Sequence, residues 1–423
     1  MDIAPSLYLA QAPAVVPRPP LAGSLRCDVA VVGGGIAGCS AALYLARRGY
    51  RVVLIEAQAV GAGASGRSGG QFLAGFACGQ AVLERALGAD GAARLFAQSR
   101  VGVALVERLL AEEAIDIERV PGTLQVAVKA SQAAALREEQ TQLAKLGCEG
   151  LEYLEPPRLR ELVASERYCA GLYDRAAFHG NPLLYVRGLA RAAERAGTII
   201  HEQTRVTQVA SDSGIAVRTK SGTVHAASAL LACNAHIGAV APALGRRLLP
   251  VGTFIVATAP LGAARAAAML PSDAAVADCN HVLDYFRRSR DHRLLFGGRA
   301  GVPGFDTAEL TRKTRERMIA VYPELANVPV DYAWGGLVDL TLNRAPDFGR
   351  VAPSLYYVQG FSGHGLVLAT LAGTLAGEAI AGQAERFDAF ARIPHRAVPA
   401  GATVANALLS VALLWNRLRD ALP

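Results

Sequence analysis

The chain has 423 residues, of which 52% are hydrophobic and 19% charged, a globular composition that excludes an intrinsically disordered protein. Its formal net charge of +7 comes from scattered residues without a long basic block, which argues against nucleic-acid binding. The seven cysteines form no CxxC pair and the eight histidines show no metal-ligand spacing, so we expect a reduced, cytoplasmic protein with neither disulfides nor a metal site.

The N-terminal segment, residues 1–26, is interrupted by prolines and lacks the charged start and apolar core of a secretory signal. It predicts an extended arm lying on the surface. Residues 27–56 then predict a compact β-turn-α-β unit. Its parts are an apolar strand at 28–32, a glycine-rich turn at 33–38, a helix at 41–48 and a second strand at 51–56.

Helical patterns and short strands follow along the rest of the chain, with no fixed-period repeat that would indicate a solenoid or a propeller. Helices are predicted at 80–114, 131–147, 181–197, 306–321 and 363–381. Strands are predicted near 123–128, 168–173, 199–201, 205–210, 214–219, 223–226, 229–232, 250–259, 282–299, 330–338 and 355–359.

Both ends of the chain have a βα pattern, and the middle is richer in antiparallel strands. This distribution predicts an α/β fold: a doubly wound, discontinuous dinucleotide-binding domain with a sheet-rich α+β substrate domain inserted into it. The expected division is an arm at 1–26, a cofactor domain at 27–80, 148–245 and 340–396, a substrate domain at 81–147 and 246–339, and an apolar C-terminal helix at 397–423.

The most specific motif is the string Gly33-x-Gly35-x-x-Gly38, which follows a predicted strand, opens a helix, and has Glu56 at the end of the next strand. That context is the dinucleotide-binding fingerprint, whereas the bare string is weak evidence. Gly33 permits the tight turn, Gly35 lets a pyrophosphate approach the backbone, and Gly38 lets the helix pack on the strand. Glu56 is expected to bind the adenosine ribose. Further contacts are expected from Ile36, Ala37, Ala57, Val206 and Asn234.

A second glycine-rich loop, residues 63–71, distinguishes FAD from NAD as the cofactor. Arg67 can neutralise the pyrophosphate or brace the loop, and the glycines let backbone N–H groups face a flavin. The alternative is a flexible loop that binds nothing. No second GxGxxG follows a strand, so a separate nicotinamide domain is not expected. The residues predicted to contact FAD here are Ser65, Arg67, Ser68, Gly69, Gly70 and Gln71.

A third cluster lies at 357–366, where a strand ends in a glycine-rich turn that starts an apolar helix. Exposed N–H groups at a helix start form an anion site, and the N1–C2=O edge of a flavin becomes negative on reduction. His364 is expected either near the flavin or substrate, or in a purely structural bond. The predicted FAD contacts here are Gly360, Ser362, Gly363, His364, Gly365 and Leu366.

Together the three clusters resemble the D-amino-acid-oxidase-like superfamily of FAD-dependent oxidoreductases, and most closely its branch of bacterial gamma-glutamylputrescine oxidases. The segments that carry the resemblance to this branch are 63–71, 334–339, 343–349 and 359–365. The resemblance implies hydride transfer from the carbon beside a substrate amine to flavin N5, hydrolysis of the imine, and reoxidation of the flavin by oxygen to give hydrogen peroxide. The implied partners are FAD, a small amine and oxygen.

Amino-acid oxidases of this superfamily hold the substrate carboxylate with an arginine shortly before the last glycine-rich segment, but residues 336–341 contain none. This departure favours a polyamine-like substrate. Asp339 is a candidate for attracting the ammonium or for bonding nearby backbone, and Arg344 for meeting a distal carboxylate or pairing with Asp347. With His364 they are the predicted catalytic residues. Weaker candidates are Tyr285, Arg287, Arg299 and Trp334, the last of which fits a core position equally well.

The apolar tail, residues 397–415, admits a helix packed on the core, a helix in a membrane interface, or a transmembrane anchor. Peripheral membrane contact through it motivates an alternative function, a flavin dehydrogenase of an amine or amino acid that passes electrons to a quinone or a partner protein. A third hypothesis is a flavin-binding subunit without catalytic activity.

Overall fold

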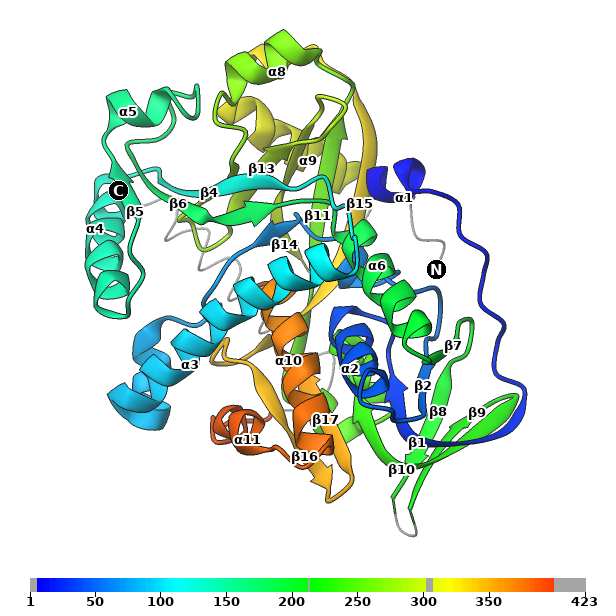
Figure 1. The fold of residues 1–423 in the computed structure, drawn as a ribbon. Coiled ribbons are helices and arrows are strands. Elements are labelled where there is room, and N and C mark those ends of the chain that lie inside the picture. Colours follow the sequence, from blue (N-terminus) through cyan, green and yellow to red (C-terminus); the bar gives the residue numbers. More distant parts are fainter. Residues whose placement is uncertain (1–5, 212–213, 302–306, 399–423) are drawn as a thin grey trace.

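The computed structural model describes residues 6–211, 214–301 and 307–398, with only the backbone described at 299–301. The predicted apolar tail beyond 398 and the side chain of Arg299 lie outside these residues. Two sheets dominate the described part of the chain, with a long helix running between them (Figure 1).

The first sheet has the strand order β16-β17-β10-β1-β2-β7, in which the run from β17 to β7 is parallel. A hairpin of β8 and β9 extends from β10. The sheet therefore combines strands from both ends of the chain, as the α/β prediction requires. Its strands are β1 (Gly23–Val32), β2 (Val52–Ile55), β7 (Ile199–His201), β8 (Val206–Ala210), β9 (Ile215–Thr219), β10 (Gly222–Leu231), β16 (Asp347–Ala352) and β17 (Leu355–Gln359).

Two apolar helices, α2 (Ile36–Ala46) and α10 (Gly365–Ile380), lie side by side within the core. They pack so closely that a Cβ added at Gly373 would lie 2.1 Å from the carbonyl oxygen of Ala37. A helix that is hydrophobic on every side must be covered on every side. The covering helices are α3 (Gln80–Glu112), α6 (Pro182–Arg195) and α11 (Glu385–Ala391).

The second sheet is mostly antiparallel, with the order β15-β11-β14-β13-β12-β4-β6-β3 and β5 paired to β6. Side chains of β11 alternate between two cores: Phe254 and Val256 face one cluster, and Ile255 and Ala257 the other. The strands are β3 (Gln71–Phe72), β4 (Val120–Ala127), β5 (Leu151–Leu154), β6 (Ala170–His179), β11 (Leu248–Thr258), β12 (Ala275–Asp278), β13 (Asp284–Arg288), β14 (Leu294–Gly301) and β15 (Val330–Thr341).

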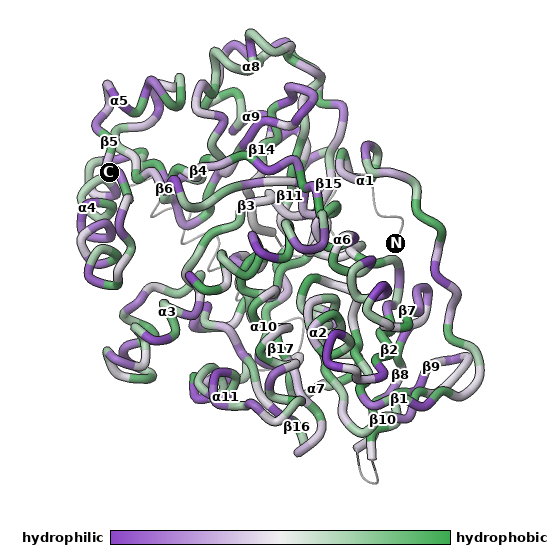
Figure 2. Tube along the Cα trace, in the orientation of Figure 1, coloured by the Kyte–Doolittle hydropathy of each residue, from purple (hydrophilic) through white to green (hydrophobic). Residues whose placement is uncertain are grey.

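The remaining helices surround this sheet or connect the two halves. Hydrophobic residues concentrate in the interior where β1, β17 and α10 meet, whereas the outlying α4 mixes hydrophilic and hydrophobic residues (Figure 2). These helices are α1 (Leu7–Gln11), α4 (Ala130–Lys145), α5 (Pro156–Arg160), α7 (Pro242–Gly245), α8 (Ala263–Met269) and α9 (Thr307–Val321), with 3-10 turns at Ala64–Gly66, Asn234–Ala239 and Pro323–Leu325.

Two features differ from the sequence-based expectation. The strands β5 and β6 fall within 148–245, which was assigned to the cofactor domain, yet they pair in the second sheet. The N-terminal segment is exposed along most of 13–20, but α1 is not part of a surface arm, because Leu7 and Tyr8 are only 1% and 2% exposed. The prolines of this segment predict an irregular backbone, but they do not predict which of its side chains are buried.

No individual helix in the described ranges is long and apolar enough to cross a membrane; α10 and α11 meet that criterion only as a pair bent by 119°.

Candidate cofactor and substrate cavity

A cavity of about 1110 Å³ lies between the two sheets. On one side it is lined by the segments that follow β1, β2, β10 and β17, all parallel strands of the first sheet. In doubly wound folds ligands bind outside the carboxyl ends of such strands. The opposite side is formed by the second sheet and α4, so one cavity spans both predicted domains.

The turn after β1 has the geometry that a dinucleotide requires. Gly33 has a φ of +113°, and a Cβ there would lie 2.4 Å from the carbonyl oxygen of Ala232. A Cβ at Gly38 would lie 1.9 Å from the carbonyl oxygen of Gly33, so only glycine lets α2 start this close to the turn. The N-terminus of α2 consequently opens into the cavity, with the N–H groups that attract phosphate.

Glu56, at the end of β2, reaches across this turn. Its carboxylate accepts hydrogen bonds from the backbone N–H of Gly34 at 2.7 Å and of Gln58 at 2.8 Å. Burial raises the pKa of Glu56, and these backbone donors partly oppose that shift. A carboxylate keeps further lone pairs after accepting two bonds, so it can still receive ribose hydroxyls.

The loop at 63–71 closes the cavity from the second side. Ser65 accepts a hydrogen bond from the backbone N–H of Ile36 at 3.0 Å, which ties the loop to the start of α2. Arg67 donates from Nε to the carbonyl oxygen of Gly335 on β15 at 2.6 Å, and burial lowers the pKa of its guanidinium to about 10. The loop therefore joins the two halves of the protein at the cavity.

The ring of Tyr285 occupies a slot between two glycines. A Cβ at Gly69 would come within 2.7 Å of this ring, and one at Gly297 within 2.3 Å. Tyr285 lines the cavity from β13, and burial raises the pKa of its hydroxyl, so the ring presents a neutral wall.

The turn before α10 forms the third side, and Asp339 holds it. This side chain is 1% exposed and its carboxylate accepts a hydrogen bond from the backbone N–H of Gly360, while burial raises its pKa to about 7. Of the two roles considered for Asp339, its contacts match the bond to nearby backbone. The imidazole of His364 bonds the carbonyl oxygen of Ala74 at 3.0 Å and also lines the cavity, and burial lowers its pKa.

Nearly all the predicted site residues line this cavity. The two exceptions, Gly38 and Gly360, lie directly behind it, where they allow close packing and the turn. Those that line it are Gly33, Gly35, Ile36, Ala37, Glu56, Ala57, Ser65, Arg67, Ser68, Gly69, Gly70, Gln71, Val206, Asn234, Asp339, Arg344, Ser362, Gly363, His364, Gly365 and Leu366.

Not all of the weaker candidates for site residues line the cavity. Trp334 is 0% exposed and belongs to the core; Arg287 is buried behind the loop and does not line the cavity. The suggested pairing of Arg344 with Asp347 is wrong, because the carboxylate of Asp347 bonds Arg247, Tyr357 and Gln359. Arg344 is exposed at the cavity, and no ion pair of its guanidinium occurs within the described ranges.

The sequence interpretation missed the acidic part of the lining. One face of α4 contributes Glu138, Glu139 and Gln142, and β6 contributes Asp174 opposite Thr123 of β4. Asp278 at the end of β12 also lines the cavity, and burial raises its pKa to about 7. The helical spacing of polar residues on α4 was a usable signal, but such a stripe more often marks a solvated face.

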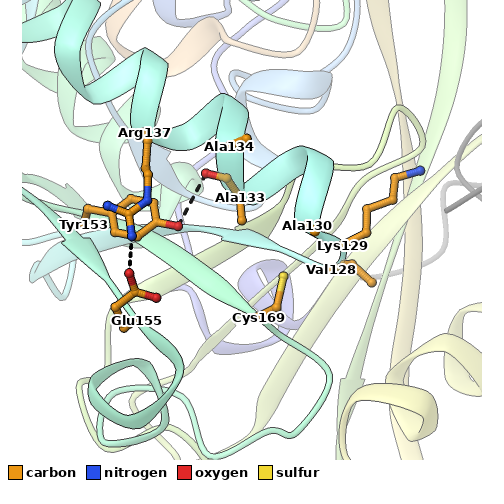
Figure 3. Close-up of a pocket in the computed structure, with 9 residues that line it drawn as sticks. All are labelled: Val128, Lys129, Ala130, Ala133, Ala134, Arg137, Tyr153, Glu155 and Cys169. Atoms are coloured by element: carbon orange, nitrogen blue, oxygen red, sulfur yellow. Dashed lines mark hydrogen bonds and ion pairs between the residues drawn. The ribbon is translucent and has the colours of Figure 1, made fainter.

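A second hollow, between α4 and β5, shares no lining residue with the large cavity (Figure 3). Arg137 pairs with Glu155 and stacks over the ring of Tyr153, whose hydroxyl donates to the carbonyl oxygen of Ala133 at 3.4 Å. These polar groups already interact with one another, so the hollow lacks the converging polar groups that a ligand site would offer.

The residues of the large cavity fit FAD. Two helix N-termini, those of α2 and α10, open into one cavity, and the glycines of the first turn, Gly33, Gly34 and Gly35, leave its backbone open to a ligand. A helix N-terminus suits the pyrophosphate, and Glu56 suits the ribose. No cluster of three or more potential metal ligands occurs in the part of the chain that the structure describes.

Comparisons with known proteins agree. The family model described as FAD dependent oxidoreductase, DAO, matches residues 28–379. The chain is 38% identical over 418 residues to the gamma-glutamylputrescine oxidoreductase of Escherichia coli (strain K12), covering 99% of this chain and 98% of that protein. It is 36% identical to the probable oxidoreductase OrdL of Rhizobium meliloti (strain 1021), covering 98% and 97%.

Among solved structures, the fold is similar to that of the glycine oxidase from Geobacillus kaustophilus, with a TM-score of 0.71 at 24% identity, covering 85% of this chain and 95% of that one. The mixed α/β architecture, the glycine turn and the family match all lead to the same assignment. The chain belongs to the DAO family of FAD-dependent oxidoreductases.

Proposed function

We propose that the protein oxidises an amine whose reactive carbon carries no carboxylate, with gamma-glutamylputrescine or a related polyamine derivative as substrate. The relative from Escherichia coli is named for this substrate, and its similarity extends over nearly the whole of both chains. The same proposal includes release of a carbonyl compound and transfer of the electrons to oxygen.

The observation that carries the proposal is the lining contributed by β15 and β11. Gly336 and Val338 lie beside Thr253 and Val251, and all four line the cavity. No arginine occurs at 336–341, where an amino-acid oxidase would place the group that holds a carboxylate next to the reactive carbon. This wall accepts a methylene group beside the amine and offers a carboxylate no cationic partner.

The acidic residues farther along the cavity favour a cationic substrate. No cation pairs with Glu139 within the described ranges, and burial raises the pKa of this carboxyl group. Burial also raises the pKa of Asp278, to about 7. A substrate ammonium group other than the reacting amine would offset part of that desolvation cost by placing a positive charge beside these carboxyl groups.

Arg344 supports the glutamyl part of the proposed substrate. It lines the cavity from the turn between β15 and β16, where its backbone adopts a φ of +58°. That turn is fixed by hydrogen bonds from Thr341 to the Ala345 carbonyl and from the Ala345 N–H to Asn343. A residue held in the left-handed region by its neighbours is constrained in direction, and here the guanidinium can meet a distal carboxylate.

FAD supplies the acceptor for the hydride that leaves the carbon beside the amine. Loss of hydride from the neutral amine leaves an iminium ion, which gives a proton to water, and water then hydrolyses the imine to an aldehyde and ammonia. The protein's part is to hold the amine neutral and oriented against the flavin, with Tyr285 and Val338 forming an apolar wall there. We assign none of the cavity residues as an obligatory acid or base.

An anaerobic flavin-reduction screen tests the substrate. Gamma-glutamylputrescine and putrescine should bleach the visible flavin band faster than glycine or either enantiomer of alanine. If the amino acids bleach it and no polyamine derivative does, the proposal is wrong.

A parallel experiment tests the electron acceptor. The substrate-reduced enzyme is mixed with oxygenated buffer or with a soluble quinone, and reoxidation and peroxide are followed. Fast reoxidation by oxygen with peroxide release supports the oxidase. Reoxidation by quinone alone would instead establish a dehydrogenase.

A further inference from the structure

Three side chains from distant parts of the chain bond successive carbonyl groups of the cavity loop. Trp334 of β15 donates from its indole N–H to the carbonyl oxygen of Arg67 at 3.0 Å. Tyr8 of α1 donates from its hydroxyl to the carbonyl oxygen of Ser68 at 3.0 Å. Arg287 of β13 donates from Nε to the carbonyl oxygen of Gly69 at 2.8 Å.

The three donors form one buried cluster. Tyr8 packs edge-on against Trp334 with ring centroids 5.3 Å apart, and Arg287 donates to the Tyr8 hydroxyl at 3.0 Å. Their exposed fractions are 2%, 0% and 6% for Tyr8, Trp334 and Arg287. None of the three lines the cavity, whereas Ser68, Gly69 and Gly70 all do. The loop therefore separates this cluster from the cavity.

The peptide geometry of the loop then fixes where its donors point. The described chain contains no cis peptide bond, and in a trans peptide each N–H points opposite to the preceding carbonyl. Because the carbonyls of Arg67, Ser68 and Gly69 point toward the cluster, the N–H groups of Ser68, Gly69 and Gly70 point away from it. These three N–H groups have no acceptor among the residues that the structure describes.

We propose that Tyr8, together with Arg287 and Trp334, orients the loop so that the N–H groups of Ser68, Gly69 and Gly70 meet acceptor atoms of the bound flavin. Tyr8 is then a positioning residue that does not touch the cofactor itself. The N-terminal helix α1 becomes a functional part of the FAD site, although it lies outside the dinucleotide-binding unit in sequence. Buried N–H groups without partners are costly, so a ligand that accepts from them gains affinity.

The variant Tyr8→Phe tests this proposal. It keeps the ring contact with Trp334 and removes the hydroxyl that donates to Ser68 and accepts from Arg287. The matched control is Tyr322→Phe. Tyr322 is likewise buried, with 1% exposed, and its hydroxyl also donates to a backbone carbonyl, that of Met269, at 3.0 Å, but it belongs to the other core and does not line the cavity.

We expect Tyr8→Phe to raise the FAD dissociation constant about fivefold, the equivalent of one net hydrogen bond, and to alter the visible circular dichroism and midpoint potential of the bound flavin. Tyr322→Phe should lower the unfolding temperature to a similar extent and leave the flavin properties unchanged. Unchanged flavin properties in Tyr8→Phe, or equal changes in both variants, would overturn the proposal.

A second measurement needs no substitution. Coupling between two sites is reciprocal, so FAD binding to the apoprotein must stabilise α1 in return. Hydrogen exchange in residues 6–12 should slow on addition of FAD by a larger factor than in α9, which lies on the opposite face of the second sheet. Exchange at 6–12 that does not respond to FAD would refute the role of α1.

Discussion

The carboxylate of Asp339 accepts a hydrogen bond from the backbone N–H of Gly360, and this contact ties the end of β15 to the turn that precedes α10. The backbone N–H of Ser362 reinforces the connection by donating to the Asp339 carbonyl at 3.0 Å. The second sheet and the flavin-side helix are thus linked through one buried acid, whose protonation affects stability.

The substitution Asp339→Asn should remove a pH dependence. Burial raises the pKa of Asp339 to about 7, whereas an aspartate in an unfolded chain titrates near 4. Between these values the unfolded chain has lost the proton and the folded protein retains it, so wild-type stability falls as pH rises from about 4 to about 7. The variant does not titrate there, and its free energy of unfolding relative to wild type should increase over that range by on the order of 3 kcal/mol.

Denaturant unfolding of both FAD-saturated proteins at about pH 5 and about pH 8 measures this change. A difference in unfolding free energy that is the same at both pH values would contradict the raised pKa of Asp339.

The substitution Gly38→Ala should disrupt the first turn. Its Cβ would lie 1.9 Å from the carbonyl oxygen of Gly33, which belongs to the backbone and cannot rotate away. We expect a loss of at least about 2 kcal/mol in unfolding free energy and little retained flavin. The control Gly238→Ala places its Cβ 3.7 Å from the nearest atom and outside the cavity, so it should keep its flavin. Flavin content after purification and thermal unfolding compare the two variants. A flavin-replete Gly38→Ala protein of normal stability would show that the turn does not require glycine at this position.

The substitution Glu139→Gln should weaken binding of cationic amines. It removes a cavity carboxylate whose pKa is raised by burial and keeps its shape. Loss of one charged contact should raise KM for gamma-glutamylputrescine about tenfold, with a smaller change in kcat. The control Glu84→Gln alters an exposed residue of α3 outside the cavity and should leave KM unchanged. Equal KM values in wild type and Glu139→Gln would remove this residue from substrate recognition.

The substitution Arg344→Gln should change KM for one of two substrates and leave KM for the other unchanged. If its guanidinium meets the glutamyl carboxylate, KM for gamma-glutamylputrescine should rise by about tenfold while KM for putrescine, which has no carboxylate, stays the same. Steady-state kinetics with both amines provide the internal control. An equal rise in KM for the two substrates would show that Arg344 stabilises the cavity in general and does not bind the carboxylate.

Local sequence patterns predicted the FAD-binding turn well. Gly33, Gly38 and Glu56 lie within one β-turn-α-β unit, where chain order nearly fixes the geometry. The strands β1, β2 and β17 and the helices α3, α6 and α10 were predicted near their observed positions because each has a clear period or a continuous apolar run.

Contacts between distant segments could not be predicted in this way. Tyr8 and Arg287 are separated by 279 residues, and nothing in the proline-rich N-terminus indicates that a tyrosine there is buried against the cavity loop. Asp174 was missed for a related reason: the predicted strand ended at residue 173, whereas β6 continues to His179 and carries this carboxylate into the cavity. The sheet membership of β6 likewise depends on its pairing with β4, and that of β5 on its pairing with β6, which a single sequence does not encode locally.

The strand order of the first sheet also constrains how the protein is made. β1 and β2 leave the ribosome before β10, but β1 lies next to β10, and β10 lies next to β17, which ends at Gln359. The apolar residues of β1 therefore lack their final neighbour on one side until β10 has been made, and the turn before α10 forms only after β17. Until both strands have been made, these apolar surfaces are open to aggregation, and the flavin site lacks the side that the turn before α10 forms.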